Sequence, residues 1–346
     1  MGRAKFGVFG DGKELPQIAM SKVFKNGDIR SGYYRDQTFM MAIDQLNSEQ
    51  FFAQLYANTD ISKDPHSGGR QMNSHFATRM LNNKGEWKTL TDIKNSSSDV
   101  SCVAGQMPRL VGLAYASKLY RKNKELKNYP DFSVNGNEIA FGTIGNAATS
   151  EGHFWEAINA AGVLQIPFIL SIWDDDYGIS VPSEYHTTRN DLSKALQGFQ
   201  RKNDEENGFE LFEVFGWDYI GLIDAYINAE KYARKHHVPC IIHVKELTQP
   251  QGHTTSGSHE RYKSKERLKW EKNNDCIKMM RKWILENQIA DENELDKIEN
   301  KAVLDSKKSR DIAWKDYRNE IKEDLQDAIS VLTRDRKSTR LNSSHQ

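Results

Sequence analysis

Three polar segments of the sequence have residue types that could hold a charged ligand or a metal ion. The turn Gly145–Gly152 is rich in small residues, which let a backbone approach an anion closely. The run Asp174-Asp175-Asp176 offers carboxylates, and hard cations such as Mg²⁺ prefer carboxylate and amide oxygens. An acidic run is more often a solvated turn. The third segment, residues 251–256, contains His253, a side chain suited to proton transfer near neutral pH.

Short apolar runs alternate with helical patterns and predict how these segments are positioned. Such alternation indicates βαβ units and a parallel sheet with helices on both faces, an α/β fold. Ligands of such sheets bind at the carboxyl ends of the strands, which is where the three polar segments fall. The expected strands are 138–144, 167–173, 209–215 and 239–247, and the expected helices are 107–119, 151–164 and 221–236.

Changes in composition, charge and hydrophobic pattern along the sequence divide the chain into four parts. Residues 1–100 are predicted to be an irregular and helical part of the cofactor domain, and residues 101–260 its parallel α/β core. Residues 261–335 are helical and strongly charged, as in a solvated cap or a subunit contact. The last residues, 336–346, continue no pattern and are interpreted as a non-native tail.

Composition excludes several classes of function for this chain. Its 346 residues carry 48 Lys and Arg against 48 Asp and Glu, so no basic excess favours nucleic acid as a partner. No apolar run is long enough for a membrane span. Three isolated cysteines and the lack of a signal-like N-terminal segment favour a reducing compartment, with the cytoplasm as the default.

The same segments resemble the alpha component of thiamine diphosphate-dependent 2-oxo acid dehydrogenases. That family carries GDG, then NN about thirty residues later, then Tyr. Here the frame reads Gly145-Asn146-Ala147, and Asp175 lies 29 positions after Asn146, followed by Tyr177. The amide and the carboxylate have exchanged places, which preserves the ligand charge. By this resemblance Mg²⁺ would be bound by Asn146, Asp175 and Tyr177.

Further segments over residues 5–330 share the resemblance, and the implied roles are carried over residue by residue. By the family pattern Tyr34, Arg35, Gly145, Ala147 and Ala148 would contact the cofactor, as would Asn146, Ser101 and Asp175, and Val103 would lie between its two rings. His253 would assist proton transfer and acyl handover. An ion pair between Arg35 and Asp36 is the simpler alternative for that arginine. Gly10-Asp11-Gly12 is a literal GDG, but its position does not fit the motif.

Residues 69–76, GRQMNSHF, resemble the branched-chain (2-oxoisovalerate) members of the family most. The resemblance implies oxidative decarboxylation of a 2-oxo acid and transfer of the acyl group to a lipoyl-bearing acyltransferase. It also implies a beta component, separate or fused, and a dimer of alpha–beta units. We expect this chain to be a fragment that needs the beta half. Pyruvate or acetoin dehydrogenase, or a non-catalytic assembly subunit with a degraded metal site, are the alternatives.

Overall fold

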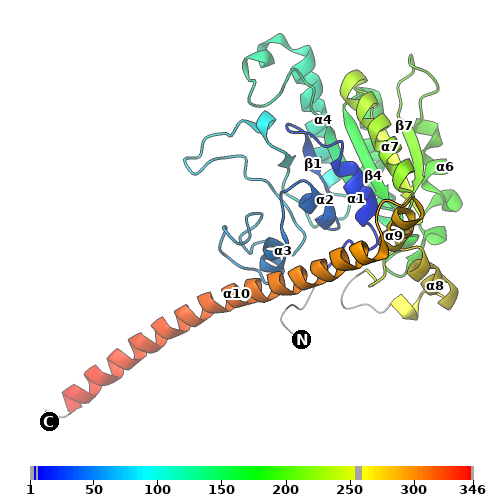
Figure 1. The fold of residues 1–346 in the computed structure, drawn as a ribbon. Helices are drawn as coiled ribbons and strands as arrows, with labels where there is room; N and C mark the ends of the chain where they lie inside the picture. Colours follow the sequence, from blue (N-terminus) through cyan, green and yellow to red (C-terminus); the bar gives the residue numbers. More distant parts are fainter. Residues whose placement is uncertain (1–3, 5–6, 254–258, 344–346) are drawn as a thin grey trace.

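The computed structural model describes residues 4, 7–253 and 259–343, which form one α/β body with a long C-terminal helix (Figure 1). The strands are β1 (Ile29–Ser31), β2 (Asn95–Ser96), β3 (Ala140–Gly145), β4 (Phe168–Trp173), β5 (Tyr177–Gly178), β6 (Val181–Pro182), β7 (Glu210–Phe215) and β8 (Cys240–Lys245). The α-helices are α1 (Glu14–Ser21), α2 (Gln37–Ala42), α3 (Ser48–Leu55), α4 (Gln106–Lys122), α5 (Gly152–Leu164), α6 (Leu192–Leu196), α7 (Tyr219–Lys231), α8 (Lys265–Asn273), α9 (Cys276–Glu286) and α10 (Glu292–Ser343).

Six parallel strands form the central sheet, in the order β2-β1-β3-β4-β8-β7. The apolar runs predicted as strands are β3, β4, β7 and β8, and the alternating helical patterns are α4, α5 and α7. The predicted α/β fold is therefore confirmed. Because all six strands run in one direction, the loops that follow β1, β3, β4 and β8 meet at one edge of the sheet.

Each face of the sheet is covered by helices, and the pleat sends neighbouring residues to opposite faces. Along β4, Ile169 and Trp173 pack in the core under α1, α2 and α7. Phe168, Leu170 and Ile172 pack in the opposite core, under α4, α5 and α6. A fully buried side chain of this size stabilises the fold by roughly 1.5–3 kcal/mol, so the two cores fix the register of the central strands.

Two strands at one side of the sheet, β1 and the edge strand β2, come from the first hundred residues, which the sequence predicted only as irregular or helical. Their register depends on Arg30 of β1, whose side chain is fully buried. The Arg30 guanidinium donates to both carboxylate oxygens of Asp99, at 3.0 Å each, and to Asp36 at 2.7 Å. Asp36 also accepts a hydrogen bond from Thr143 of β3. This network ties β1 to its neighbours and holds the segment that contains Tyr34 and Arg35.

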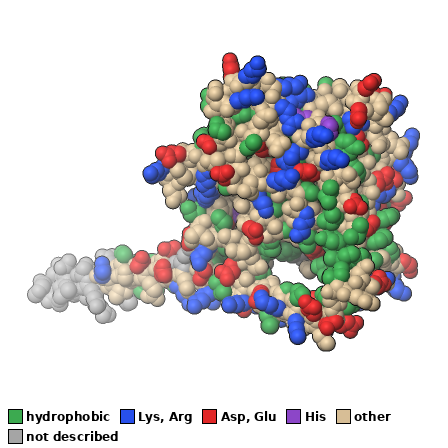
Figure 2. All heavy atoms as spheres, turned by 45° about the horizontal axis from the view of Figure 1, so that its top comes forward, with side chains coloured by type: hydrophobic (Ala, Val, Ile, Leu, Met, Phe, Trp, Pro, Cys, Tyr) green, Lys and Arg blue, Asp and Glu red, His purple; other side chains and the backbone are tan. Residues whose placement is uncertain are grey.

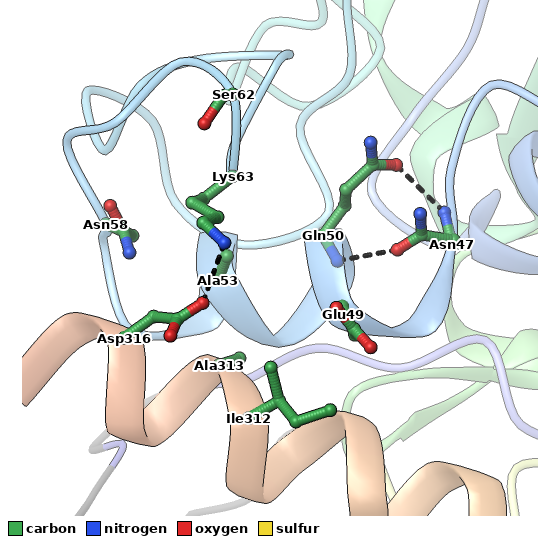
Figure 3. A pocket seen from close by; sticks show the side chains of 10 residues that line it. All are labelled: Asn47, Glu49, Gln50, Ala53, Asn58, Ser62, Lys63, Ile312, Ala313 and Asp316. Carbon is green, nitrogen blue, oxygen red and sulfur yellow. Dashed lines mark hydrogen bonds and ion pairs between the residues drawn. The ribbon is translucent and has the colours of Figure 1, made fainter.

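Helix α10 packs along α3 and then leaves the body (Figure 1). Figure 3 shows Ala313 of α10 beside α3, and Asp316 beside Lys63 of the loop that follows α3. Asp316 and Lys63 form an ion pair at 2.8 Å. The ring of Trp314 lies 5.2 Å from that of Tyr56. The helix continues to Ser343 without a break at residue 336.

Acidic and basic side chains are interspersed over the face shown in Figure 2, as expected from a net charge of zero. Among the described residues, no helix combines the length and the apolar character that crossing a bilayer requires.

Candidate cofactor site

A cavity of about 390 Å³ opens at the edge of the sheet where the loops after β1, β3, β4 and β8 meet. Every residue that the sequence singled out for a cofactor or metal lines it: Tyr34, Arg35, Ser101, Val103, Gly145, Asn146, Ala147, Ala148, Asp175, Tyr177 and His253. Lys13, His75, Met72 and Trp173 line it too, without having been singled out. The structure thus brings the predicted residues together, while their roles remain predictions.

The turn after β3 forms one wall of the cavity. Its backbone is fixed by a hydrogen bond from Asn146 N to the Trp173 carbonyl of β4, at 3.1 Å. The Asn146 side chain is 3% exposed, and its Nδ2 has no hydrogen-bond partner in the part of the chain described. A buried amide without a partner is costly. An amide offers both donors and an acceptor, so Asn146 suits either a phosphate oxygen or a cation.

The three carboxylates after β4 point in three directions. Asp174 accepts a hydrogen bond from His243 of β8 at 2.8 Å, and the other ring nitrogen of His243 contacts Ser193 at 2.7 Å. Asp176 is about half exposed, 45% by side chain, and has a left-handed backbone with φ 70°. Asp175 alone is buried and lines the cavity. Only one of the three charges therefore faces a ligand there.

Lys13 is the partner of Asp175. Its ammonium is 1% exposed and donates to Asp175 Oδ2 at 2.8 Å, to the Thr248 carbonyl at 3.0 Å and to Gln249 Oε1 at 2.7 Å. Burial alone would raise the pKa of Asp175, but the charge of Lys13, with those of His253 and Arg35, outweighs burial and lowers it to about 2. Sequence reasoning missed this pair because nothing local distinguishes Lys13 from a solvated lysine.

Arg35 and His253 also line the cavity and contact each other. The Arg35 guanidinium is buried and donates to the backbone carbonyls of His253, at 3.0 Å, and of Phe9. An ion pair with Asp36, the simpler alternative, is not what the described contacts show, because Asp36 is paired with Arg30. His253 Nε2 lies 3.5 Å from Asp175 Oδ2, and its Nδ1 has no partner among the described residues. Residues 254–256, the rest of the predicted histidine loop, lie outside those residues.

The rim of the cavity is more apolar. Val103 and Met72 are 49% and 46% exposed there, and Ser101 Oγ lies 3.0 Å from His75 Nε2. Gly178 faces the β3 turn, and a Cβ at Gly178 would lie 2.6 Å from that of Ala147. Small residues at both positions are therefore needed for the two loops to approach each other.

Two buried histidines, His253 and His237, determine how the free energy of unfolding changes at acidic pH. Burial lowers the pKa of His253 and of His237 from 6.5 to about 4, although Asp175 opposes the shift at His253 and the hydrogen bond to Gly136 opposes it at His237. Between these pH values the unfolded chain binds protons that the folded chain excludes, so the free energy of unfolding falls as the pH falls from 6.5 to 4. Asp175 contributes at lower pH: its pKa is lowered from 3.8 to about 2, so its contribution to the free energy of unfolding is lost as the pH falls through that range.

We expect His237→Asn to lose less stability than the wild type between pH 7 and pH 4.5, measured by urea denaturation. His237 is buried outside the cavity, and its left-handed φ of 55° tolerates Asn. An equal loss in both proteins would show that His237 does not contribute.

One other group of potential metal ligands occurs among the described residues, at Asp191, Glu213 and His243. Lys245 already bridges the two carboxylates, at 3.2 and 3.1 Å. His243 uses both ring nitrogens, as described above. This group is therefore satisfied by internal contacts.

The cavity fits a diphosphate cofactor by its charge and its donors. Two buried cations, Lys13 and Arg35, face one carboxylate, Asp175, and the unpartnered Asn146 amide lies among them. Within the described part of the chain, Asp175 Oδ1 receives only a long hydrogen bond, 3.3 Å, from the Tyr177 backbone. One carboxylate oxygen and one amide thus remain for a cation, which is compatible with Mg²⁺ because that ion usually uses one or two carboxylates plus phosphate oxygens.

Comparisons with known proteins agree with this arrangement. A family model described as the dehydrogenase E1 component matches residues 1–315. The chain is 30% identical over 225 residues to the pyruvate dehydrogenase E1 component subunit alpha of Rickettsia bellii, covering 64% of this chain and 61% of that protein. It is 26% identical over 297 residues to the mitochondrial 2-oxoisovalerate dehydrogenase subunit alpha of Mus musculus, covering 84% and 57%. The chain thus spans about three fifths of the length of these relatives.

Proposed function

Since the chain belongs to the dehydrogenase E1 component family, as an alpha component, we propose that it binds thiamine diphosphate with Mg²⁺ in the cavity at the sheet edge. There it would serve the oxidative decarboxylation of a 2-oxo acid and pass the acyl group to a lipoyl-bearing acyltransferase. The observation that carries this proposal is the convergence of Lys13, Arg35, Asp175 and the unpartnered Asn146 amide on one cavity beside a small-residue turn.

In this proposal the diphosphate lies between the turn Gly145–Ala148 and Arg35. The planar guanidinium of Arg35 suits phosphate oxygens, and Tyr34, whose ring lies 5.4 Å from that guanidinium, packs beside it. Asn146, Asp175 and Tyr177 would hold Mg²⁺ against the diphosphate. Ser101 would contact the cofactor, and Val103 would lie between its two rings.

Thiamine diphosphate, when bound, supplies the carbon that attacks the 2-oxo group and accepts the electrons released with carbon dioxide. The chain's own residues orient it and handle protons. His253 is neutral at pH 7, since burial, with Arg35 and Lys13, lowers its pKa to about 4. Its Nδ1 is therefore able to accept a proton, while Nε2 faces Asp175.

For the substrate we favour a branched-chain 2-oxo acid, with pyruvate as the second candidate. Met72 belongs to the segment that resembles branched-chain members, and with Val103 and Ile179 it gives the cavity an apolar rim. Pyruvate is the alternative because of the 30% identity to the Rickettsia bellii protein. Decarboxylation rates with 3-methyl-2-oxobutanoate and with pyruvate separate the two: a higher kcat/KM for pyruvate would contradict the branched-chain assignment.

Activity in this proposal requires further protein. A beta component, separate or fused, would complete the cofactor site, and dimers of alpha–beta units would dock the lipoyl-bearing acyltransferase in the cytoplasm. Calorimetric titration of thiamine diphosphate in the presence of Mg²⁺ and a matching beta component tests the proposal. We expect saturable binding at one site per chain. Absence of binding under these conditions would contradict the proposed function.

A further inference from the structure

The Lys13 ammonium is an unusual element of the cavity because it is buried in contact with the only described carboxylate that lines it. Its three N–H bonds have three acceptors, namely Asp175 Oδ2, the Thr248 carbonyl and Gln249 Oε1. An ammonium with all its donors satisfied and 1% exposure is held in one place. Burial lowers the pKa of Lys13, and the charge of Asp175 and its hydrogen bond oppose this shift. With its three acceptors in place, the ammonium contributes a fixed positive charge beside Asp175.

The backbone around Lys13 is shaped to deliver this charge. Gly12 has a left-handed φ of 80°, and a Cβ there would lie 2.3 Å from the Thr248 carbonyl oxygen. Only glycine permits that approach. Gln17 of α1 donates to the Lys13 carbonyl at 3.0 Å and fixes the residue from its other side. Helix α1 thereby carries the lysine into the site from a segment more than 160 residues away from Asp175.

We propose that Lys13 is a resident cation of the diphosphate site. Its charge lets the site bind a diphosphate group without a divalent metal. When a divalent metal is present, Lys13 competes with it for Asp175. This inference rests on the proposed function and deepens it. Diphosphate binding would be assisted by Mg²⁺ rather than strictly dependent on it. A site with a carboxylate and a neutral amide but no buried cation beside them would need the metal.

The charges facing the cavity explain the effect. Lys13 neutralises Asp175, so Arg35 leaves the site with an excess positive charge before any metal binds. Without Lys13, the carboxylate would cancel Arg35 and a diphosphate would meet no net positive charge. Lys13 also occupies Asp175 Oδ2, which lowers the affinity of the free site for a divalent cation.

Titration calorimetry with inorganic pyrophosphate, in EDTA and in Mg²⁺, tests this for the intact chain. We expect the wild type to bind pyrophosphate in EDTA, and Lys13→Met to lose at least about tenfold in affinity there while recovering in saturating Mg²⁺. Lys13→Arg, which keeps the charge, retains more binding in EDTA than Lys13→Met. Binding of Mn²⁺ to the diphosphate-free protein, followed by electron paramagnetic resonance, should be tighter in Lys13→Met because Asp175 is released.

Lys263→Met is the matched control. Lys263 is also a buried lysine paired with a buried carboxylate, Glu271 at 2.7 Å, but it does not line the cavity. The Lys263→Met variant should therefore bind pyrophosphate in EDTA as the wild type does. Wild-type binding that disappears in EDTA but is present in Mg²⁺ would overturn the role of Lys13 and leave the proposed function standing, and this comparison needs no variant. No binding of thiamine diphosphate even with Mg²⁺ and a beta component would instead remove the proposed function.

Discussion

Replacing Arg30 with Met is expected to lower the free energy of unfolding by about 3–5 kcal/mol, the usual cost of leaving a buried charge without its partner. Arg30 is fully buried and pairs with Asp36 and Asp99, which are buried as well. Its loss leaves two carboxylates without a cation and removes the side-chain hydrogen bond from β1 to Ser96 of β2. Equilibrium denaturation in urea, followed by tryptophan fluorescence, measures the change.

Arg281→Met is the matched control, because Arg281 also pairs with two carboxylates, Asp296 and Glu299, but on the surface. Exposed pairs contribute little to stability, so this variant should unfold close to the wild type. Equal destabilisation in the two variants would show that the buried position of the Arg30 network does not determine its contribution.

Asp175→Ala is expected to lower the affinity for Mn²⁺, at saturating thiamine diphosphate, by about 100-fold or more. Loss of a group that only supports a metal ligand already costs 10–100-fold, and Asp175 provides the only described carboxylate that lines the cavity. Electron paramagnetic resonance of bound Mn²⁺ measures the affinity without any need for turnover.

Asp176→Gly tests whether position, rather than charge alone, matters. Asp176 is adjacent to Asp175, but its side chain does not line the cavity, and its φ of 70° suits glycine. Mn²⁺ affinity should change only slightly in this variant. A comparable loss in Asp176→Gly, or none in Asp175→Ala, would contradict the assignment of Asp175 as a metal ligand.

The central part of the fold could be predicted from sequence because its signals are local. Residues 167–173 and 239–247 are apolar runs with turn residues around them, and they became β4 and β8. Strand β1 carries no such signal: Ile29–Ser31 has three residues, and its middle one is a charged arginine. Only partners distant in sequence, Asp99 among them, make that arginine a core residue.

The candidate site divides in the same way. The strand–turn pattern indicated that the turn 145–152 and the acidic run 174–176 are neighbours. The family resemblance then singled out Asn146 and Asp175, and both line one cavity. The residue types alone did not distinguish the three aspartates, and only the family resemblance singled out Asp175. What turns the other two away from the cavity is His243 binding Asp174 and the backbone of Asp176. The sequence also could not reveal Lys13, whose role exists only once α1 packs beside the loop after β8.

Helix α10 has a consequence for how the stability of this chain is observed. Beyond its contact with α3, the side chains described for residues 318–334 are exposed. This segment packs against no core, so its unfolding is not coupled to that of the body. It follows a helix–coil equilibrium of its own, in which the helix is only marginally stable in water and unfolds gradually. Far-ultraviolet circular dichroism would mix this gradual melting with the cooperative transition of the body. Probes inside the sheet report that transition alone, and Trp173 is one of them.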